Sequence, residues 1–302
     1  MMNKLKYCIL ITGIPLVLAQ SGPRTFATPG EARDGLIQAA ANGMDSVKAF
    51  FGPGSAEIVR SGDEVQDKLA LERFNRLAAE KTQWEPDSMN PDRMTLAIGV
   101  AEWPFAVPLV RKHGRWFFDV QEGKAEIRRR TIGRQELDAI QICRGYVEAQ
   151  QTYAATDWAG KGVLQYASRI VSSPAKKDGL YWPGDDSPVA EAFAKAVAQG
   201  YSLPNGQQRP FHGYFFKMLM SQGPEAAGGA QDYVIHGLAI GGFALIAWPA
   251  EYGVSGIKTF MVNHDGVVYE KDLGPQTGSV AKAITSFNPD KSWDVVPEDD
   301  GQ

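Results

Sequence analysis

The hydrophobic pattern of this chain changes period twice, and each change runs from the spacing of helices to that of strands. Helical spacing begins near Thr28 and gives way to alternation at Met94. It returns from Gly133 to Thr156 and gives way to alternation again from Tyr214. A helix buries one face about every 3.6 residues and a strand every second residue, so the pattern sets the order of the elements. Two such successions in 302 residues predict an α+β protein of two domains.

The helical part of the first domain, which we place at residues 20–130, begins with a strong start signal. Thr28-Pro29-Gly30-Glu31 combines an N-cap Thr, a Pro in the first turn and a Glu three residues after the cap. This helix should end at Asn42-Gly43, where the sequence carries a stop signal. A second helix should end at Gly52-Pro53, and a third should begin after Asp63.

Alternating residues from Met94 to Val100 predict the first strand of this domain. Trp103 to Val110 and Arg115 to Val120 are further strands, and Lys112-His113-Gly114 has the composition of a hairpin turn between them. Helices followed by an antiparallel meander resemble the cystatin-like and nuclear-transport-factor-like folds, in which a cone-shaped sheet wraps on helices. Folds of that kind often enclose a cavity, for which Glu102, Trp103 and Trp116 are the candidate lining residues.

The second domain, residues 131–293, begins with a helix over 133–156 and is followed by a flexible acidic tail at 294–302. One face of that helix is apolar and holds Leu137, Ile140, Cys143, Val147 and Ala154. Cys143 is therefore expected to be a buried structural thiol. An antiparallel sheet should pack on this helix, with strands at 214–220, 233–235, 242–248, 257–263 and 267–271 and a short helix near 190–199 before them.

Aromatic residues concentrate in the second domain, and consecutive aromatics on a strand point to opposite faces of a sheet. We expect the segment 157–210 to cover the second face; the alternative is an exposed surface for a partner or ligand. The contact candidates on this hypothesis are Trp182, Tyr181, His212, Phe215, His264 and Asp265.

Residues 1–19 have the features of a Sec-type signal peptide. Lys4 and Lys6 precede an apolar run that ends in small residues at Ala19. Cleavage there predicts a periplasmic or secreted protein of the cell envelope without a stable membrane span; an uncut anchor is the alternative. Cys143 would remain as a single Cys, which excludes an internal disulfide.

Cleavage would leave 29 basic and 35 acidic residues, a formal charge of −6. An acidic chain without basic clusters is a poor candidate for binding nucleic acid. Arg128, Arg129 and Arg130 form the one basic run, and we interpret it as a solvated segment between the domains.

Motifs for catalysis or metal binding are not evident in the sequence. The four histidines, at 113, 212, 236 and 264, form no metal-binding spacing, although they could still meet in the fold. Asp157 to Gly162 lacks the patterns of phosphate and calcium loops and predicts a turn that ends the helix. Asn263-His264-Asp265-Gly266 is interpreted as a hairpin turn between two strands. We therefore expect no catalytic residue, no metal and no cofactor.

Several long segments resemble one bacterial family, the domain-of-unknown-function family 2950. They include IGRQELDAIQICRGYVEAQQTYA, FHGYFFKMLMSQGPEAAGGAQDYV and GGFALIAWPAEYGVSGIKTFMVNHDGVVYEKDLG, within a match from about Thr28 to Trp293. Members look like exported proteins, and the family carries no established activity. The second domain also resembles the globular heads of type IV pilins and pseudopilins, with Arg144, Tyr153 and Gly213-Tyr214 at matching places. Pilins begin with an apolar helix that polymerises in a membrane, whereas here the helix follows another domain and is only moderately apolar.

The expected function is that of an exported, non-catalytic protein that acts through contact with an envelope protein or through self-association. The alternative is a periplasmic ligand-binding protein or enzyme that uses a pocket in the first domain.

Overall fold

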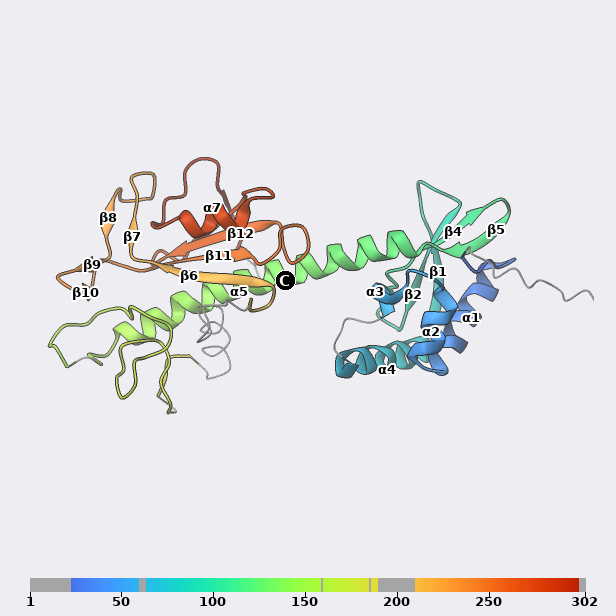
Figure 1. Ribbon diagram of the computed structural model, residues 1–302, viewed down its shortest axis with the longest axis horizontal. Helices are drawn as coiled ribbons and strands as arrows, with labels where there is room; N and C mark the ends of the chain where they lie inside the picture. The colour runs from blue at the N-terminus through green and yellow to red at the C-terminus, as the bar shows by residue number, and fades with distance from the viewer. Residues whose placement is uncertain (1–22, 60–63, 159, 185, 190–209, 299–302) are drawn as a thin grey trace, which may run out of the picture. The chain divides into compact units, whose positions relative to one another are not determined.

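The computed structural model describes residues 23–59, 64–158, 160–184, 186–189 and 210–298. The fold is α+β, and the chain divides into two compact units, Met1–Ile127 and Arg128–Gln302 (Figure 1). The expected signal peptide at 1–19 and the expected short helix at 190–199 lie outside the described residues. Among the helices described, none is both long and apolar enough to cross a membrane.

The first unit opens with four helices, α1 (Pro29–Ala41), α2 (Met44–Phe51), α3 (Ala56–Val59) and α4 (Glu64–Glu80). The predicted start of α1 is confirmed, because the Thr28 hydroxyl accepts a hydrogen bond from the backbone N–H of Glu31 at 3.2 Å. The predicted ends at Asn42-Gly43 and Gly52-Pro53 are also confirmed.

The strands of this unit form an antiparallel sheet in the order β1-β2-β4-β5, with β3 beside β2. They are β1 (Thr82–Pro86), β2 (Arg93–Ile98), β3 (Trp103–Pro104), β4 (Leu109–Lys112) and β5 (Arg115–Phe118). The predicted hairpin is confirmed, with His113 and Gly114 at φ 52° and 76°. The single strand expected at 103–110 was wrong: Pro104 and Pro108 have no N–H to continue a ladder, and the segment divides into β3 and β4.

Helix α5 (Val120–Ala154) starts much earlier than predicted. The Asp119 carboxylate accepts hydrogen bonds from the N–H groups of Gln121 and Glu122 at 3.1 and 3.0 Å, so it caps the helix. Arg128–Arg130 therefore begin the second unit, at the expected boundary between the two units, but they lie within a helix. Arg and Glu are good helix formers, and the charged stretch extends the helix rather than interrupting it.

The buried stripe of α5 is shifted from the predicted one. Cys143 and Val147 are buried as expected, but Leu137 is 62% exposed. Tyr146, Gln150 and other residues replace it on the stripe, which consists of Ala139, Ile140, Ile142, Cys143, Tyr146, Val147, Ala149, Gln150 and Tyr153. Burial raises the pKa of the Cys143 thiol to about 12, so this thiol is unreactive at neutral pH.

The second unit is built on a five-stranded antiparallel sheet in the order β14-β13-β12-β11-β6. Its strands are β6 (Tyr214–Leu219), β11 (Ala244–Pro249), β12 (Lys258–Asn263), β13 (Val268–Asp272) and β14 (Asp294–Val295). Figure 1 shows α5 along one face and the short helix α7 (Thr277–Ala283) on the other. Two small hairpins extend from this sheet: β7 (Ser221–Gln222) with β8 (Gln231–Asp232), and β9 (Val234–Ile235) with β10 (Leu238–Ala239).

The two faces of this sheet are covered differently from our expectation. The described part of segment 157–189 packs on the α5 face, where it contributes Ala167, Leu180 and Trp182. The second face is covered by α7 and Phe287 instead. Helix α7 was not predicted, and Lys217 of β6 holds its end by donating to the carbonyls of Lys282 and Ile284 at 2.8 and 2.5 Å. The second face is thus a closed core rather than an open surface.

Candidate functional site

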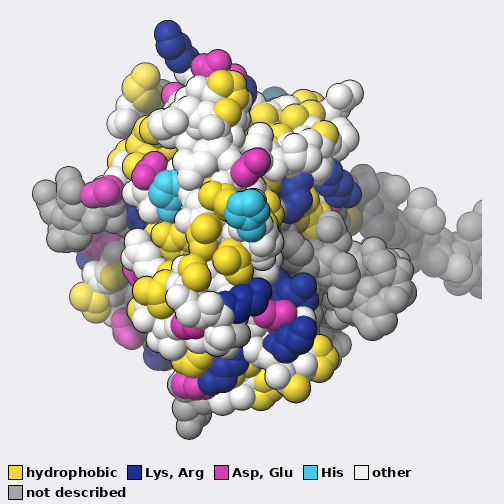
Figure 2. All heavy atoms as spheres, turned by 90° about the vertical axis from the view of Figure 1, so that its left-hand side faces the viewer, with side chains coloured by type: hydrophobic (Ala, Val, Ile, Leu, Met, Phe, Trp, Pro, Cys, Tyr) yellow, Lys and Arg dark blue, Asp and Glu magenta, His cyan; other side chains and the backbone are white. Residues whose placement is uncertain are grey.

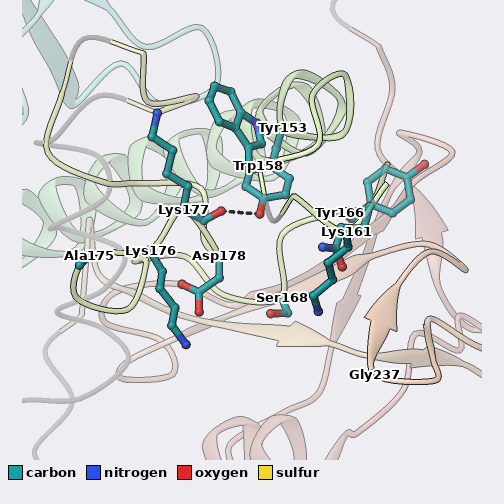
Figure 3. A pocket seen from close by; sticks show the side chains of 11 residues that line it. Tyr153, Trp158, Lys161, Tyr166, Ser168, Ala175, Lys176, Lys177, Asp178 and Gly237 are labelled. Atoms are coloured by element: carbon teal, nitrogen blue, oxygen red, sulfur yellow. Dashed lines mark hydrogen bonds between the residues drawn. The ribbon is translucent and has the colours of Figure 1, made fainter. Parts of the chain in front are cut away.

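A hollow of about 590 Å³ lies beside the C-terminal end of α5, between the segment 157–178 and the turn of the β9–β10 hairpin (Figure 3). Lysines and polar side chains supply most of its wall. The lining residues are Tyr153, Trp158, Lys161, Gln165, Tyr166, Ser168, Ala175, Lys176, Lys177, Asp178 and Gly237.

Buried Gln150 of α5 holds the backbone of Ala167, between the lining residues Tyr166 and Ser168. Its side-chain oxygen accepts from the N–H of Ala167 at 2.9 Å, and its amide nitrogen donates to the Ala167 carbonyl at 3.0 Å. The same nitrogen donates to the Tyr146 hydroxyl at 2.9 Å, so both N–H donors of the buried amide are used. Next to this clamp, the N–H of Tyr166 donates to the carbonyl of Ala239 at 2.8 Å, which joins the segment to β10.

A second attachment holds the segment that carries Lys176 and Lys177. The Tyr153 hydroxyl donates to the carbonyl of Lys177 at 2.6 Å, the dashed line in Figure 3. The Lys177 ammonium lies 4.5 and 4.9 Å from the ring centroids of Trp158 and Trp182. It also donates to the Asp186 carboxylate at 2.5 Å. Hydrogen bonds from Lys177 and Trp182 hold the pKa of Asp186 below its ordinary value.

The one carboxylate among the lining residues, that of Asp178, is engaged by its own loop. It accepts from the Ser173 N–H at 2.7 Å and from the Ser173 hydroxyl at 2.9 Å. Burial alone would raise the pKa of Asp178, but these bonds and nearby Arg169 lower it overall. Asp178 therefore stays ionised, with its charge largely taken up by groups outside the hollow.

Lys161 and Lys176 are the two lysines of the hollow whose ammonium groups make no ion pair within the part of the chain that the structure describes. They come from different turns and extend to the same side in Figure 3. The side chains of Gln165, Tyr166 and Ser168 add amide and hydroxyl donors to the same wall. Two ammonium groups with neighbouring neutral donors form a surface suited to an anion.

The residues of this site are dispersed over two turns and form no sequence motif, so the sequence did not predict it. The turn predicted at 157–162 is confirmed, since the Asp157 carboxylate accepts from the N–H groups of Lys161 and Gly162 at 3.1 and 2.6 Å. This turn presents Lys161, although the segment contains no phosphate-loop motif. The adjacent lysines Lys176 and Lys177 were the one feature of the sequence that could have indicated an anion site here.

The predicted contact residues do not gather at one site. Tyr181 and Trp182 are buried at 9% and 4% exposure in the α5 core. Phe215 is half-buried on the opposite face against Trp248, with ring centroids 5.8 Å apart. Trp182 nevertheless supports the hollow through Lys177.

His264 and Asp265 lie in the turn between β12 and β13, as the hairpin interpretation predicts. Asn263 accepts from the Asp265 N–H at 3.2 Å, and Gly266 adopts a φ of 81°. The His264 ring packs edge-on against Tyr233 and Phe243 at 5.6 and 6.2 Å. This pair therefore shapes a turn.

The other histidines also occupy turns. His113, His212 and His236 have φ values of 52°, 47° and 52°, and each precedes a glycine of positive φ. His212 additionally contacts the Asp138 carboxylate of α5 at 2.6 Å, a pairing that the sequence did not reveal. Within the described residues, no three or more His, Cys, Asp or Glu side chains form a group that could hold a metal ion.

The first unit contains a smaller hollow of about 170 Å³, and its lining is apolar. The three candidates named for a pocket in this unit do not line it: Trp103 is 53% exposed, Trp116 is buried, and Glu102 pairs with Lys81 at 2.6 Å. The lining residues are Leu36, Ala40, Met44, Val47, Phe51, Ile58, Ala70, Leu71, Phe74, Phe105, Ala106, Val107 and Ile127.

Comparison with known proteins places the chain in one family. The family described as "Protein of unknown function (DUF2950)" matches residues 23–296, and the chain belongs to it. No curated protein and no solved structure matches the chain.

Proposed function

We propose that this member of the DUF2950 family is an exported binding protein whose second unit holds an anionic ligand in the lysine-lined hollow. The observation that carries the proposal is the pair of ammonium groups of Lys161 and Lys176, which line one hollow without a carboxylate partner in the described residues. Lysines usually extend into solvent or pair with acids, so two unpaired ones at a concave surface favour an anion.

The charges around the hollow support a ligand with a compact anionic group, such as a phosphate or carboxylate. Lys177 pairs with Asp186, while Asp178 accepts hydrogen bonds from Ser173 and lies 3.9 Å from Arg169. Lys161 and Lys176 thus supply the uncompensated charge. The hydroxyl and amide groups of Tyr166, Ser168 and Gln165 would bind further polar parts of the ligand.

Titration with inorganic phosphate, followed by the fluorescence of Trp158 and by calorimetry, tests this proposal. Replacing Lys161 and Lys176 together by Gln should weaken binding at least about tenfold, because hydrogen bonds to charged groups each contribute about 1.5–3 kcal/mol. The matched control replaces Lys48 and Lys112, surface lysines of the first unit, by Gln. Equal affinity in the two double variants would contradict the proposal.

Export is the second part of the proposal, and residues 1–19 carry it. The support is the order of a basic region, an apolar run and small residues at the cleavage position. Mass spectrometry of protein recovered from the periplasm or the medium should give an N-terminus near Gln20. Recovery only from the cytoplasm, with Met1 retained, would contradict it.

A pilin-like head that acts through protein contact or self-association is also proposed for the second unit. Its support is the packing of α5 on one face of an antiparallel sheet, the arrangement that the resemblance implies. Solution scattering and recovery of partners from a periplasmic extract test this role. A monomer that recovers no partner would count against it.

A second candidate function belongs to the apolar hollow of the first unit, which suits a small hydrophobic ligand. Its aromatic lining, including Phe51, Phe74 and Phe105, excludes a charged ligand because an unpaired charge is costly to bury there. Replacing Ala70 of α4 by Phe would fill the hollow and should abolish uptake of an apolar fluorescent probe. The same change at Ala79, which is on α4 outside the lining, is the control.

A further inference from the structure

Exposed aliphatic side chains surround the lysine-lined hollow. Val163 and Leu164, which directly precede the lining residues Gln165 and Tyr166, are 39% and 58% exposed. Exposed aliphatic residues also occur on and beside the β9–β10 hairpin, namely Val234, Ile235 and Ile240 at 38%, 40% and 41%. Single exposed aliphatic residues are common on proteins, whereas a group around one opening indicates a contact surface.

Backbone contacts bring the segments that carry these residues next to the hollow. The hydrogen bond from Tyr166 to Ala239 ties the segment after Leu164 to β10, and Gly237 at the hairpin tip lines the hollow. Figure 2 views the end of the second unit that carries this hairpin. It shows hydrophobic side chains around histidine side chains, with Lys and Arg side chains gathered beside them. We call the five aliphatic residues together with Lys161 and Lys176 the docking face.

The shape of the docking face differs from that of a protein core. The hairpin consists of two-residue strands joined at His236 and Gly237, whose φ values are 52° and 79°. A two-stranded hairpin gains little stability by itself, so its exposed Val and Ile side chains are not explained by packing within the hairpin. Exposed aliphatic side chains on and beside this hairpin and in the segment before Gln165, together with two lysines of the hollow, match the two layers of a membrane surface, where acyl chains lie beneath anionic headgroups.

We propose that the docking face binds the surface of a lipid bilayer that contains anionic phospholipids. Leu164, Ile235 and their aliphatic neighbours enter between the headgroups, while Lys161 and Lys176 bind the phosphate of a lipid in the hollow. This inference rests on the proposed anion site and names the source of its ligand. A protein partner is less suited to this face, because protein interfaces are enriched in aromatic residues and Arg, and its exposed apolar residues are Val, Leu and Ile.

Vesicle flotation tests the inference with protein purified as the cell processes it, its N-terminus established by mass spectrometry. Vesicles of equal parts phosphatidylglycerol and phosphatidylcholine should bind the protein, and vesicles of phosphatidylcholine alone should bind it far less. Replacing Lys161 and Lys176 by Gln should weaken binding about 25-fold, since each lysine near an anionic surface contributes about fivefold. High salt should produce a similar loss through screening.

The aliphatic part of the docking face has its own variant, in which Leu164 and Ile235 are replaced by Ser. This variant should lose vesicle binding but keep its affinity for inorganic phosphate, because both side chains lie outside the hollow's lining. In the matched control, Val254 and Val280 are replaced by Ser. These side chains are 41% and 39% exposed and lie outside the docking face, so this variant should bind vesicles normally. Circular dichroism verifies that both variants fold.

The outcomes separate this inference from the function on which it rests. Phosphate binding that depends on Lys161 and Lys176, without vesicle binding, would overturn the bilayer inference and keep the anion site. The bilayer inference would also be overturned if the double variant Leu164→Ser, Ile235→Ser binds vesicles as well as the unmodified protein does. If that variant instead dissociates an oligomer seen by light scattering, the face is a protein interface, and the bilayer inference fails. If the unmodified protein binds neither phosphate nor vesicles, both proposals are overturned.

Discussion

The apolar hollow of the first unit and the lysine-lined hollow of the second unit are built in opposite ways. The hollow of the first unit lies among helices and strands, and its lining side chains belong to that unit's aromatic core. The hollow of the second unit lies under a segment without regular structure, which is attached to α5 through identifiable bonds from Gln150 and Tyr153. The first is a property of packing, so many residues share its support. The second depends on a few attachments, so single changes should affect it strongly.

This difference also bears on ligand chemistry. In the first unit, regular elements bring apolar side chains together around the hollow, whereas in the second unit two turns present lysine and hydroxyl groups to it. The four changes below test the contrast, beginning with the largest expected effect.

Trp182→Ala should remove the main support of the second hollow. The buried ring lies 4.8 Å from Trp158 and 6.3 Å from Tyr153, and it carries the Lys177 ammonium on one face. Replacing a buried large aromatic by Ala costs about 3–5 kcal/mol, and we expect that loss in the stability of the second unit. Urea denaturation followed by circular dichroism measures it, and phosphate binding should be lost as well.

Trp103→Ala is the control for this change, because Trp103 is more than half exposed on the first unit. It should alter stability by less than about 1 kcal/mol. A similarly small effect for Trp182 would mean that the segment is held by other contacts, and the contrast between the hollows would fail.

Leu36→Ala should enlarge the apolar hollow without abolishing it. Leu36 is 2% exposed and lines the hollow from α1. The expected loss is about 2–4 kcal/mol, toward the smaller value if neighbouring side chains relax into the space. Because aromatic neighbours share the support, uptake of an apolar probe should increase while phosphate binding in the second unit stays unchanged. A loss of phosphate affinity would contradict the separation of the two sites.

The sequence predicted the elements whose signals are local. The cap at Thr28, the turn at His113-Gly114 and the turn at Asn263–Gly266 depend on neighbouring residues alone, and all three are confirmed. The start of α5 was missed because the cap at Asp119 follows a strand, and the charged residues after it were interpreted as a linker. Helix α7 was missed because its support comes from Lys217, more than sixty residues earlier in the chain.

The candidate site could not be predicted from the sequence, because it too depends on contacts between residues far apart in the chain. Lys161 and Lys176 are brought together by the bonds of Gln150 and Tyr153 to a segment that has no periodicity. Contacts between side chains and distant backbone groups leave no pattern in neighbouring residues. Aromatic composition did identify the right part of the chain, but the buried members support the site rather than line its open side.

Tyr153→Phe should test one attachment while keeping the ring in place. The change removes only the hydroxyl that donates to the Lys177 carbonyl at 2.6 Å. The free energy of unfolding should fall by about 1 kcal/mol. Phosphate binding should also weaken, because Lys176 is next to Lys177, whose carbonyl is released. Tyr252→Phe is the control, since its hydroxyl bonds exposed Asp272 at 3.1 Å, away from the hollow. Unchanged affinity in Tyr153→Phe would show that this bond does not position Lys176.

Acid should release the Lys177 attachment, with the smallest effect of the four. Because its pKa is lowered in the folded protein, Asp186 stabilises the fold above its unfolded pKa of about 3.9, and this contribution is lost as the pH falls through the lower folded value. The tryptophan fluorescence of Trp158 and Trp182 should therefore stay constant from neutral pH to about 4 and change below it. The pKa of Asp178 is lowered as well, so acid also weakens the contribution of Asp178. The acid curve of the unmodified protein must therefore be compared with that of Asp186→Asn, which should lack the fluorescence change caused by protonation of Asp186. The effect is small because an exposed ion pair is screened by water.

Identical acid curves for the unmodified protein and Asp186→Asn would show that Asp186 does not hold Lys177 against the indole rings, and that the aromatic contacts suffice.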